Sequence, residues 1–134
     1  MRKTFLQVGI LFAFFGVILG AFGAHLLKEH ISADHLSTFE TGVRYQFYHA
    51  FVLLFLSVLL YKRKTKLMTY AGWFFIAGTM LFSGSIYLLA TQEITKISTS
   101  ILGPITPLGG LLLITGWLLL FLSTFQNNEY KQHK

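Results

Sequence analysis

Cysteine is absent from the 134 residues, and charged residues make up only 12% of them. Without cysteine the chain can form no disulfide, no thiolate nucleophile and no cysteine-ligated metal site. Hydrophobic residues make up 54% of the chain, which is too many for a soluble domain of this size, because a small domain has little interior in which to bury them. The composition therefore indicates a membrane protein.

Four long apolar runs account for most of the chain, at residues 5–27, 44–61, 70–90 and 101–125. Each is close to the roughly 20 residues that a helix needs to cross a hydrocarbon core about 30 Å thick. Backbone in lipid must satisfy its own hydrogen bonds, and none of the runs alternates as a barrel strand would. We therefore predict an all-α, integral membrane four-helix bundle that forms one multi-pass domain over residues 1–134.

The basic residues predict the orientation of this bundle. If each run crosses once, one side of the membrane receives eight of them: Arg2, Lys3, Lys62, Arg63, Lys64, Lys66, Lys131 and Lys134. The other side receives Lys28, Arg44 and Lys96, with four acidic residues beside them. Positive charge gathers on the cytoplasmic side, so we expect both termini in the cytoplasm, with the chain in the cell membrane and residues 25–43 outside. Attraction to anionic lipid accounts for the net charge of +6, and no nucleic-acid partner is predicted.

The first run has one alternative interpretation. The chain opens with basic residues and an apolar stretch that ends in small residues, which is the pattern of a cleavable signal peptide with a site after Gly23. The run is long for such a peptide, and we favour a retained first helix.

Small residues predict how the helices pack, because close approach of backbones drives helix association in lipid. Gly16 and Gly20 form a GxxxG pattern in the first run, and Gly109 and Gly116 are seven residues apart in the fourth. We expect Ala77 and Gly84 to play this part in the third run. These faces would pack within one bundle, and a homo-oligomer interface is the alternative.

Two prolines stand near the start of the fourth run. Pro104 is compatible with an early helical position, where backbone N–H groups have no partner to lose. Pro107 would then leave a loose or kinked outer turn. A broken helix of this kind can mark a transport site, but we favour an ordinary helix start near the membrane surface.

The second run opens with an unusually polar segment, FETGVRYQFYHAF at residues 39–51. Ser37 and Glu40 have the spacing of a capping box, which predicts a helix that begins outside the membrane, in a polar outer loop, as a short extension before the second span. Glu40 and Arg44 are four residues apart and could pair. Tyr45, Gln46 and His49 would share the opposite side of the helix.

His49 would lie about 7–8 Å deeper in the membrane than Arg44. An ionisable side chain at such depth normally has a partner, and His25 is predicted at a comparable level. Three interpretations remain open. The polar residues could form a structural hydrogen-bond network, His25 and His49 could bind a metal or haem, or the cluster could bind a lipid head group, quinone or small solute.

Several segments resemble a known family. GAFGAH at 20–25, FETGVRYQFYHA at 39–50 and, less specifically, SGSIYLL at 83–89 and GPITPLGG at 103–110 are similar to the domain-of-unknown-function family 423. The resemblance extends along essentially the whole chain and implies a small, four-span membrane protein of the bacterial plasma membrane. It implies no activity and supplies no catalytic residue. His25 is followed by Leu26, where the family pattern leads us to expect a small residue.

We therefore expect a non-enzymatic membrane protein, without a cofactor or metal ligand set, that binds a lipid or quinone-like small ligand or acts as a membrane scaffold. The alternatives are a small transporter or channel subunit, and a haem or metal protein. The candidate ligand-binding residues are His25, Glu40, Arg44, Tyr45, Gln46 and His49.

Overall fold

In a computed structural model, helices are the only regular secondary structure in the part of the chain that the structure describes. That part is residues 1–97 and 99–126, without the side chains of residues 99 and 101. Four long helices are present: α1 (Arg2–His25), α2 (Ala33–Lys62), α3 (Lys66–Ala90) and α5 (Thr99–Ser123). A 3-10 turn, η1 (Leu27–Glu29), follows α1, and the short helix α4 (Gln92–Thr95) precedes α5. All four long helices have the length and apolar composition needed to span a membrane.

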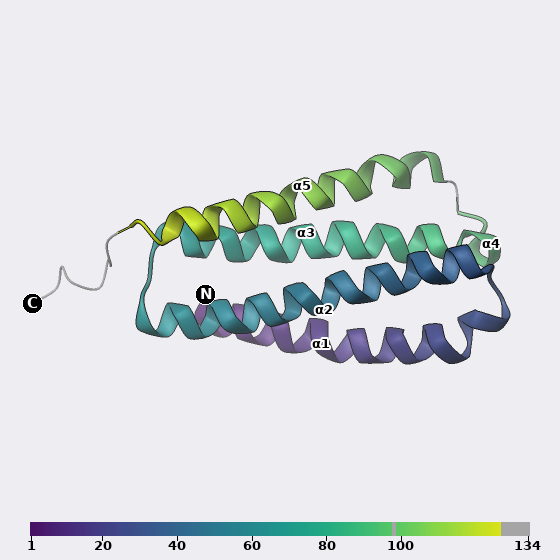
Figure 1. The fold of residues 1–134 in the computed structure, drawn as a ribbon, viewed down its shortest axis with the longest axis horizontal. Helices are drawn as coiled ribbons and strands as arrows, with labels where there is room; N and C mark the ends of the chain where they lie inside the picture. The colour runs from purple at the N-terminus through teal and green to yellow at the C-terminus, as the bar shows by residue number, and fades with distance from the viewer. Residues whose placement is uncertain (98, 127–134) are drawn as a thin grey trace, which may run out of the picture.

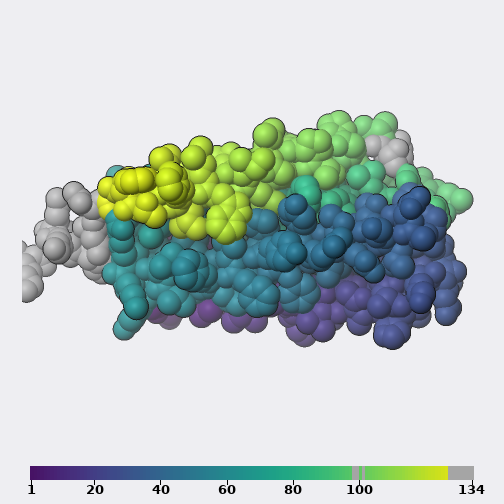
Figure 2. All heavy atoms as spheres, in the orientation of Figure 1, coloured from purple at the N-terminus to yellow at the C-terminus, as the bar shows by residue number. Residues whose placement is uncertain are grey.

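The helices lie antiparallel and pack in chain order. α1 packs chiefly on α2, α2 on α3, and α3 on α5 (Figure 1). The space-filling view in the same orientation shows α5 along the upper edge, α2 across the middle and α1 along the lower edge (Figure 2). The outer helices α1 and α5 therefore have fewer buried residues than α2 and α3, and most of their exposed side chains are apolar.

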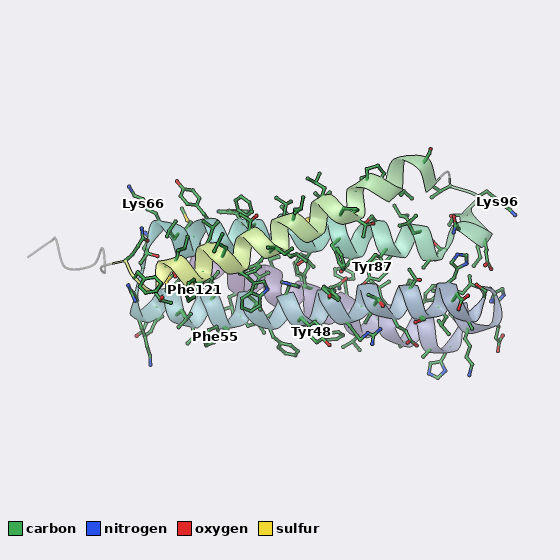
Figure 3. All side chains as sticks on the ribbon, turned by 45° about the horizontal axis from the view of Figure 1, so that its top comes forward. Tyr48, Phe55, Lys66, Tyr87, Lys96 and Phe121 are labelled. Atoms are coloured by element: carbon green, nitrogen blue, oxygen red, sulfur yellow. The ribbon has the colours of Figure 1, made fainter. Side chains whose placement is uncertain are left out.

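The two ends of the bundle differ in charge. The basic end holds the start of α1, the connection between α2 and α3, and the end of α5 (Figure 1). Its described basic residues are Arg2, Lys3, Lys62, Arg63, Lys64 and Lys66. The loop end holds η1 and α4, and Lys96 is labelled there in Figure 3. Lys131 and Lys134, on which the orientation prediction also relied, lie outside the described residues.

The start of the second helix differs from the prediction. α2 begins at Ala33, and Ser32 is its N-cap, with its hydroxyl oxygen accepting a hydrogen bond from the backbone N–H of His35 at 3.4 Å. The capping box at Ser37 was wrong, because the helix is already under way there and the Ser37 carbonyl accepts a bond from Thr41. A serine five residues upstream offers the same capping chemistry, and spacing alone does not choose between the two.

The prolines of α5 also lie differently. Pro104 and Pro107 are both inside the helix, because α5 begins at Thr99 and runs through them without a break. Pro107 cannot donate to the carbonyl of Gly103, the residue four positions earlier. A Cβ added at Gly103 would meet nothing within 4 Å, so the turn is open at that position, while Thr106 in the same turn shares a hydrogen bond with Ser85 of α3.

Glycines allow the helices to approach closely. A Cβ on Gly16 would lie 2.8 Å from the Phe47 ring, one on Gly116 2.8 Å from Phe75, and one on Gly109 2.4 Å from the backbone nitrogen of Phe82. These three therefore pack within the chain. The predicted face of α3 was wrong, since Ala77 is exposed and a Cβ on Gly84 would touch nothing within 4 Å. The close contacts of α3 are made instead by Gly72 against Phe5 and by Gly78 against Leu113.

Candidate functional site

The six candidate residues do not form one cluster. Helix pairing places Gly23 beside Phe39 and Gly16 beside Phe47, so His49 lies level with the middle of α1, roughly 12 residues from His25. At 1.5 Å per residue the two histidines are about 18 Å apart along the bundle. The expectation that they lie at a comparable level was wrong, and they cannot hold the same metal ion or haem iron. Among the described residues, no three His, Asp or Glu side chains gather as a metal site.

Gln46 links three helices. It is buried, its side-chain nitrogen donates to the carbonyl of Phe12 at 2.7 Å, and its oxygen accepts from the Tyr87 hydroxyl at 2.8 Å. Figure 3 shows Tyr87 between α3 and α2, toward the interior of the bundle. Both halves of the amide are satisfied by α1 and α3, which gives Gln46 a structural role in this part of the network.

His49 is also buried, but only one of its two ring nitrogens has a hydrogen-bond partner. Its Nδ1 lies 2.8 Å from the carbonyl of Tyr45, and a carbonyl only accepts, so Nδ1 carries the hydrogen. Nε2 is buried without a partner, and the ring is surrounded by those of Tyr45, Phe75 and Trp117 at centroid distances of 5.7–6.4 Å. Tyr45 itself is 39% exposed on the bundle surface, although the sequence pattern placed it beside Gln46 and His49.

Glu40 and Arg44 line a separate groove between α1 and α2. The groove has a volume of about 220 Å³, and its other lining residues are Gly20, Gly23, Phe39 and Val43. The predicted ion pair between Glu40 and Arg44 is not formed, because Arg44 donates instead to the Thr41 hydroxyl at 3.1 Å. The α1 wall of the groove is open at Gly20. A Cβ at that position would meet only Val43, at 3.6 Å.

The level of this groove follows from the length of α2. Arg44 and Lys62 are 18 residues apart on one helix, a separation of about 27 Å, close to the thickness of the hydrocarbon core. If Lys62 lies at the surface of one leaflet, Arg44 lies at the surface of the other. With Lys62 in that position, the Glu40–Arg44 groove would lie at head-group level, and Gln46 and His49 would lie within the hydrocarbon layer.

A polar clamp at the loop end was missed by the sequence analysis. The Glu93 carboxylate of α4 accepts hydrogen bonds from His35 Nδ1 and from the backbone N–H of Ser32, and Gln92 Nε2 donates to His35 Nε2. The hydrogen bond from His35 holds the pKa of Glu93 below its ordinary value. These residues are more than 55 positions apart, and no local pattern predicts their contact.

A family model described as "Protein of unknown function (DUF423)" matches residues 19–110, which include the Glu40–Arg44 groove and the buried residues Gln46 and His49. The chain belongs to the DUF423 family. Of the five long-range hydrogen bonds described above for His35, Gln46 and Glu93, four lie within that DUF423 segment, and the bond from Gln46 reaches Phe12, which precedes it.

Bacterial relatives match over nearly the whole chain. The UPF0382 membrane protein SH2409 of Staphylococcus haemolyticus is 42% identical over 92% of this chain and 97% of its own length. The UPF0382 membrane protein YwdK of Bacillus subtilis is 43% identical over 88% of this chain and 93% of its own length. No solved structure gives a significant match. This DUF423 chain is accordingly a multi-pass membrane protein with four spanning helices.

Proposed function

We propose that the protein is a non-enzymatic membrane protein that binds the head group of a lipid in the groove between α1 and α2. The observation that carries this proposal is the cavity of about 220 Å³ lined by Glu40 and Arg44 at head-group level. An arginine fork suits a phosphate, and a carboxylate one helical turn away suits an amine. The pair therefore fits a zwitterionic head group that carries both a phosphate and a primary amine.

The shape of the groove supports the same conclusion. Gly20 and Gly23 form its α1 wall, and Phe39 and Val43 lie next to the two charged residues in its α2 wall, so apolar walls and charged groups stand at the same level. A glycerolipid has the same mixed character where its glycerol backbone adjoins its head group. Glu40 and Arg44 are both exposed and make no ion pair with each other, so each can contact a separate group of the ligand.

The orientation of the bundle belongs to this proposal. The basic end would face the cytoplasm of a bacterial cell, and the groove would open toward the outer leaflet. Because the chain has no cysteine, single cysteines can be introduced without background. Lys64→Cys at the basic end should be protected from an impermeant maleimide in intact cells, and Lys96→Cys at the loop end should react. The reverse pattern would refute this orientation.

Native mass spectrometry of protein extracted gently from its own membrane tests the binding. The wild type should retain an amine-bearing phospholipid, and Arg44→Gln, Glu40→Gln and the groove-filling Gly20→Leu should each lose it. Lys28→Gln and Glu29→Gln are matched controls, because both residues are exposed at the same end but outside the groove. An empty wild type, or equal loss in the controls, would overturn the proposal. Solute flux in liposomes that stops in Arg44→Gln would favour a transporter instead.

A further inference from the structure

A second groove lies at the opposite, basic end of the bundle, between α2 and α5. It has a volume of about 490 Å³, within the range of small-molecule sites. Its apolar walls come from three helices: Phe55 and Leu59 of α2, Met68 of α3, and Trp117, Leu120 and Phe121 of α5. Figure 3 labels Phe55 and Phe121 at this end of the two helices.

The mouth of this groove is cationic. Lys62 and Arg63, the last residue of α2 and its C-cap, line it together with Thr124. The Arg63 guanidinium points across the groove, since both of its terminal nitrogens lie 3.4 Å from the Thr124 carbonyl. No acidic residue is among the described residues that line the groove. The two positive charges are therefore uncompensated by any carboxylate in its wall.

The groove and its mouth match the two parts of a phospholipid. Seven residues separate Phe55 from Lys62 and also Trp117 from Thr124, so the apolar part runs about 10 Å along the helices. Trp117 closes its deep end and contacts the buried ring of His49. An acyl chain inserted along this path would bring its own phosphate to the level of Lys62 and Arg63.

We propose that this groove is a binding site for one anionic phospholipid, with an acyl chain between α2 and α5 and the phosphate on Lys62 and Arg63. Charge complementarity selects an anionic lipid here, in contrast to the mixed charges of the Glu40–Arg44 groove. The site is separate from the one in the proposed function and does not rest on it. It lies at the other end of α2, about 27 Å from Arg44.

The test compares lipids on full-length protein reconstituted in bilayers of phosphatidylcholine with a minor fraction of phosphatidylglycerol. Native mass spectrometry should show one phosphatidylglycerol retained in preference to phosphatidylcholine. A basic residue near a membrane surface contributes about a fivefold preference for anionic lipid, so Lys62→Gln with Arg63→Gln should reduce the preference about 30-fold. Lys66→Gln is the matched control, because it removes one exposed positive charge at the same end but outside the groove.

A second pair of variants tests the groove without changing charge. Leu120→Trp fills the groove and should reduce retention of both lipids, whereas Leu118→Trp on the exposed face of α5 should leave it unchanged. Equal retention of the two lipids by the wild type would overturn the proposal. The proposal would also be overturned if Lys66→Gln reduced the preference for phosphatidylglycerol by as much, per charge removed, as the double variant does. That result would show that the lipid is attracted to the whole basic end and not to the groove. Unchanged retention in Leu120→Trp would show that no acyl chain occupies the groove.

Discussion

Replacing Gly109 by alanine should weaken the contact between α3 and α5. The added Cβ would lie 2.4 Å from the Phe82 nitrogen and 2.8 Å from its Cα. The first distance is about 1 Å inside the 3.4 Å at which ordinary van der Waals contact begins. Both neighbours are backbone atoms, so no side-chain rotation can relieve the overlap, and the helices must separate.

The size of the effect can be estimated from two opposing contributions. Overpacking of a tight interface costs about 1–3 kcal/mol. Alanine is a better helix former than glycine by about 0.5–1 kcal/mol, which offsets part of that cost. We therefore expect Gly109→Ala to lower the free energy of unfolding by about 1–2 kcal/mol.

Gly103 supplies the matched control on the same helix. A Cβ there would meet nothing within 4 Å, so Gly103→Ala should only gain the helix-propensity contribution of about 0.5–1 kcal/mol. Unfolding by sodium dodecyl sulfate in mixed micelles, followed by tryptophan fluorescence, measures both variants against the wild type. Trp117 reports on the interface directly, because its ring lies 5.3 Å from that of Phe75 on α3.

The refuting result is equally clear. If Gly109→Ala and Gly103→Ala change the free energy of unfolding by the same amount, close backbone approach does not hold α5 to α3. Gly109→Ser should behave like the alanine variant, because its Cβ meets the same two backbone atoms.

Three further outcomes follow from the polar contacts. Gln46→Leu should destabilise the bundle by about 1–2 kcal/mol, and a double-mutant cycle with Tyr87→Phe should show that the two losses are coupled, because one hydrogen bond joins them. Since the folded pKa of Glu93 is lowered, its link to His35 stabilises the loop end above its ordinary pKa near 4.5 and is lost as the pH falls through the folded value. The protection of residues 26–33 against hydrogen exchange, measured relative to the intrinsic rate at each pH, should therefore fall in acid, and Glu93→Gln should show the lower protection already at neutral pH. His49→Phe should be tolerated better than Gln46→Leu, because the ring keeps its aromatic neighbours and Nε2 has no partner to lose.

The sequence predicted the class of fold well, because long apolar runs in a chain with few charges have one stable form in lipid. The pairing of helices was less accessible. Gly16, Gly109 and Gly116 stood out by spacing and do pack within the chain, but Gly72 and Gly78 did not stand out, although both lie closer to a neighbour than Gly84 does. A small residue shows where close approach is possible, and only the three-dimensional arrangement decides which face is used.

The sequence predicted residues of the candidate site, but it did not predict how they are arranged. Glu40 and Arg44 do line a cavity, yet their predicted ion pair is absent, because Arg44 has a nearer partner in Thr41. His25 and His49 were separated because α1 and α2 run antiparallel, so residues at similar distances from their connection face each other, and His49 lies much farther from it than His25. The clamp between His35 and Glu93 depends on how α3 returns to the loop end, which no local motif encodes.

The order in which the helices pack has a consequence for biogenesis. Each long helix after the first packs on the one synthesised just before it, so α2 can dock on α1, α3 on α2, and α5 on α3 as each leaves the ribosome. No helix has to wait in the bilayer for a distant segment, and the loops to be closed are short. The order of synthesis is thus also a workable order of assembly. In the proposed orientation, the basic residues after α2 stay on the cytoplasmic side, where translation takes place.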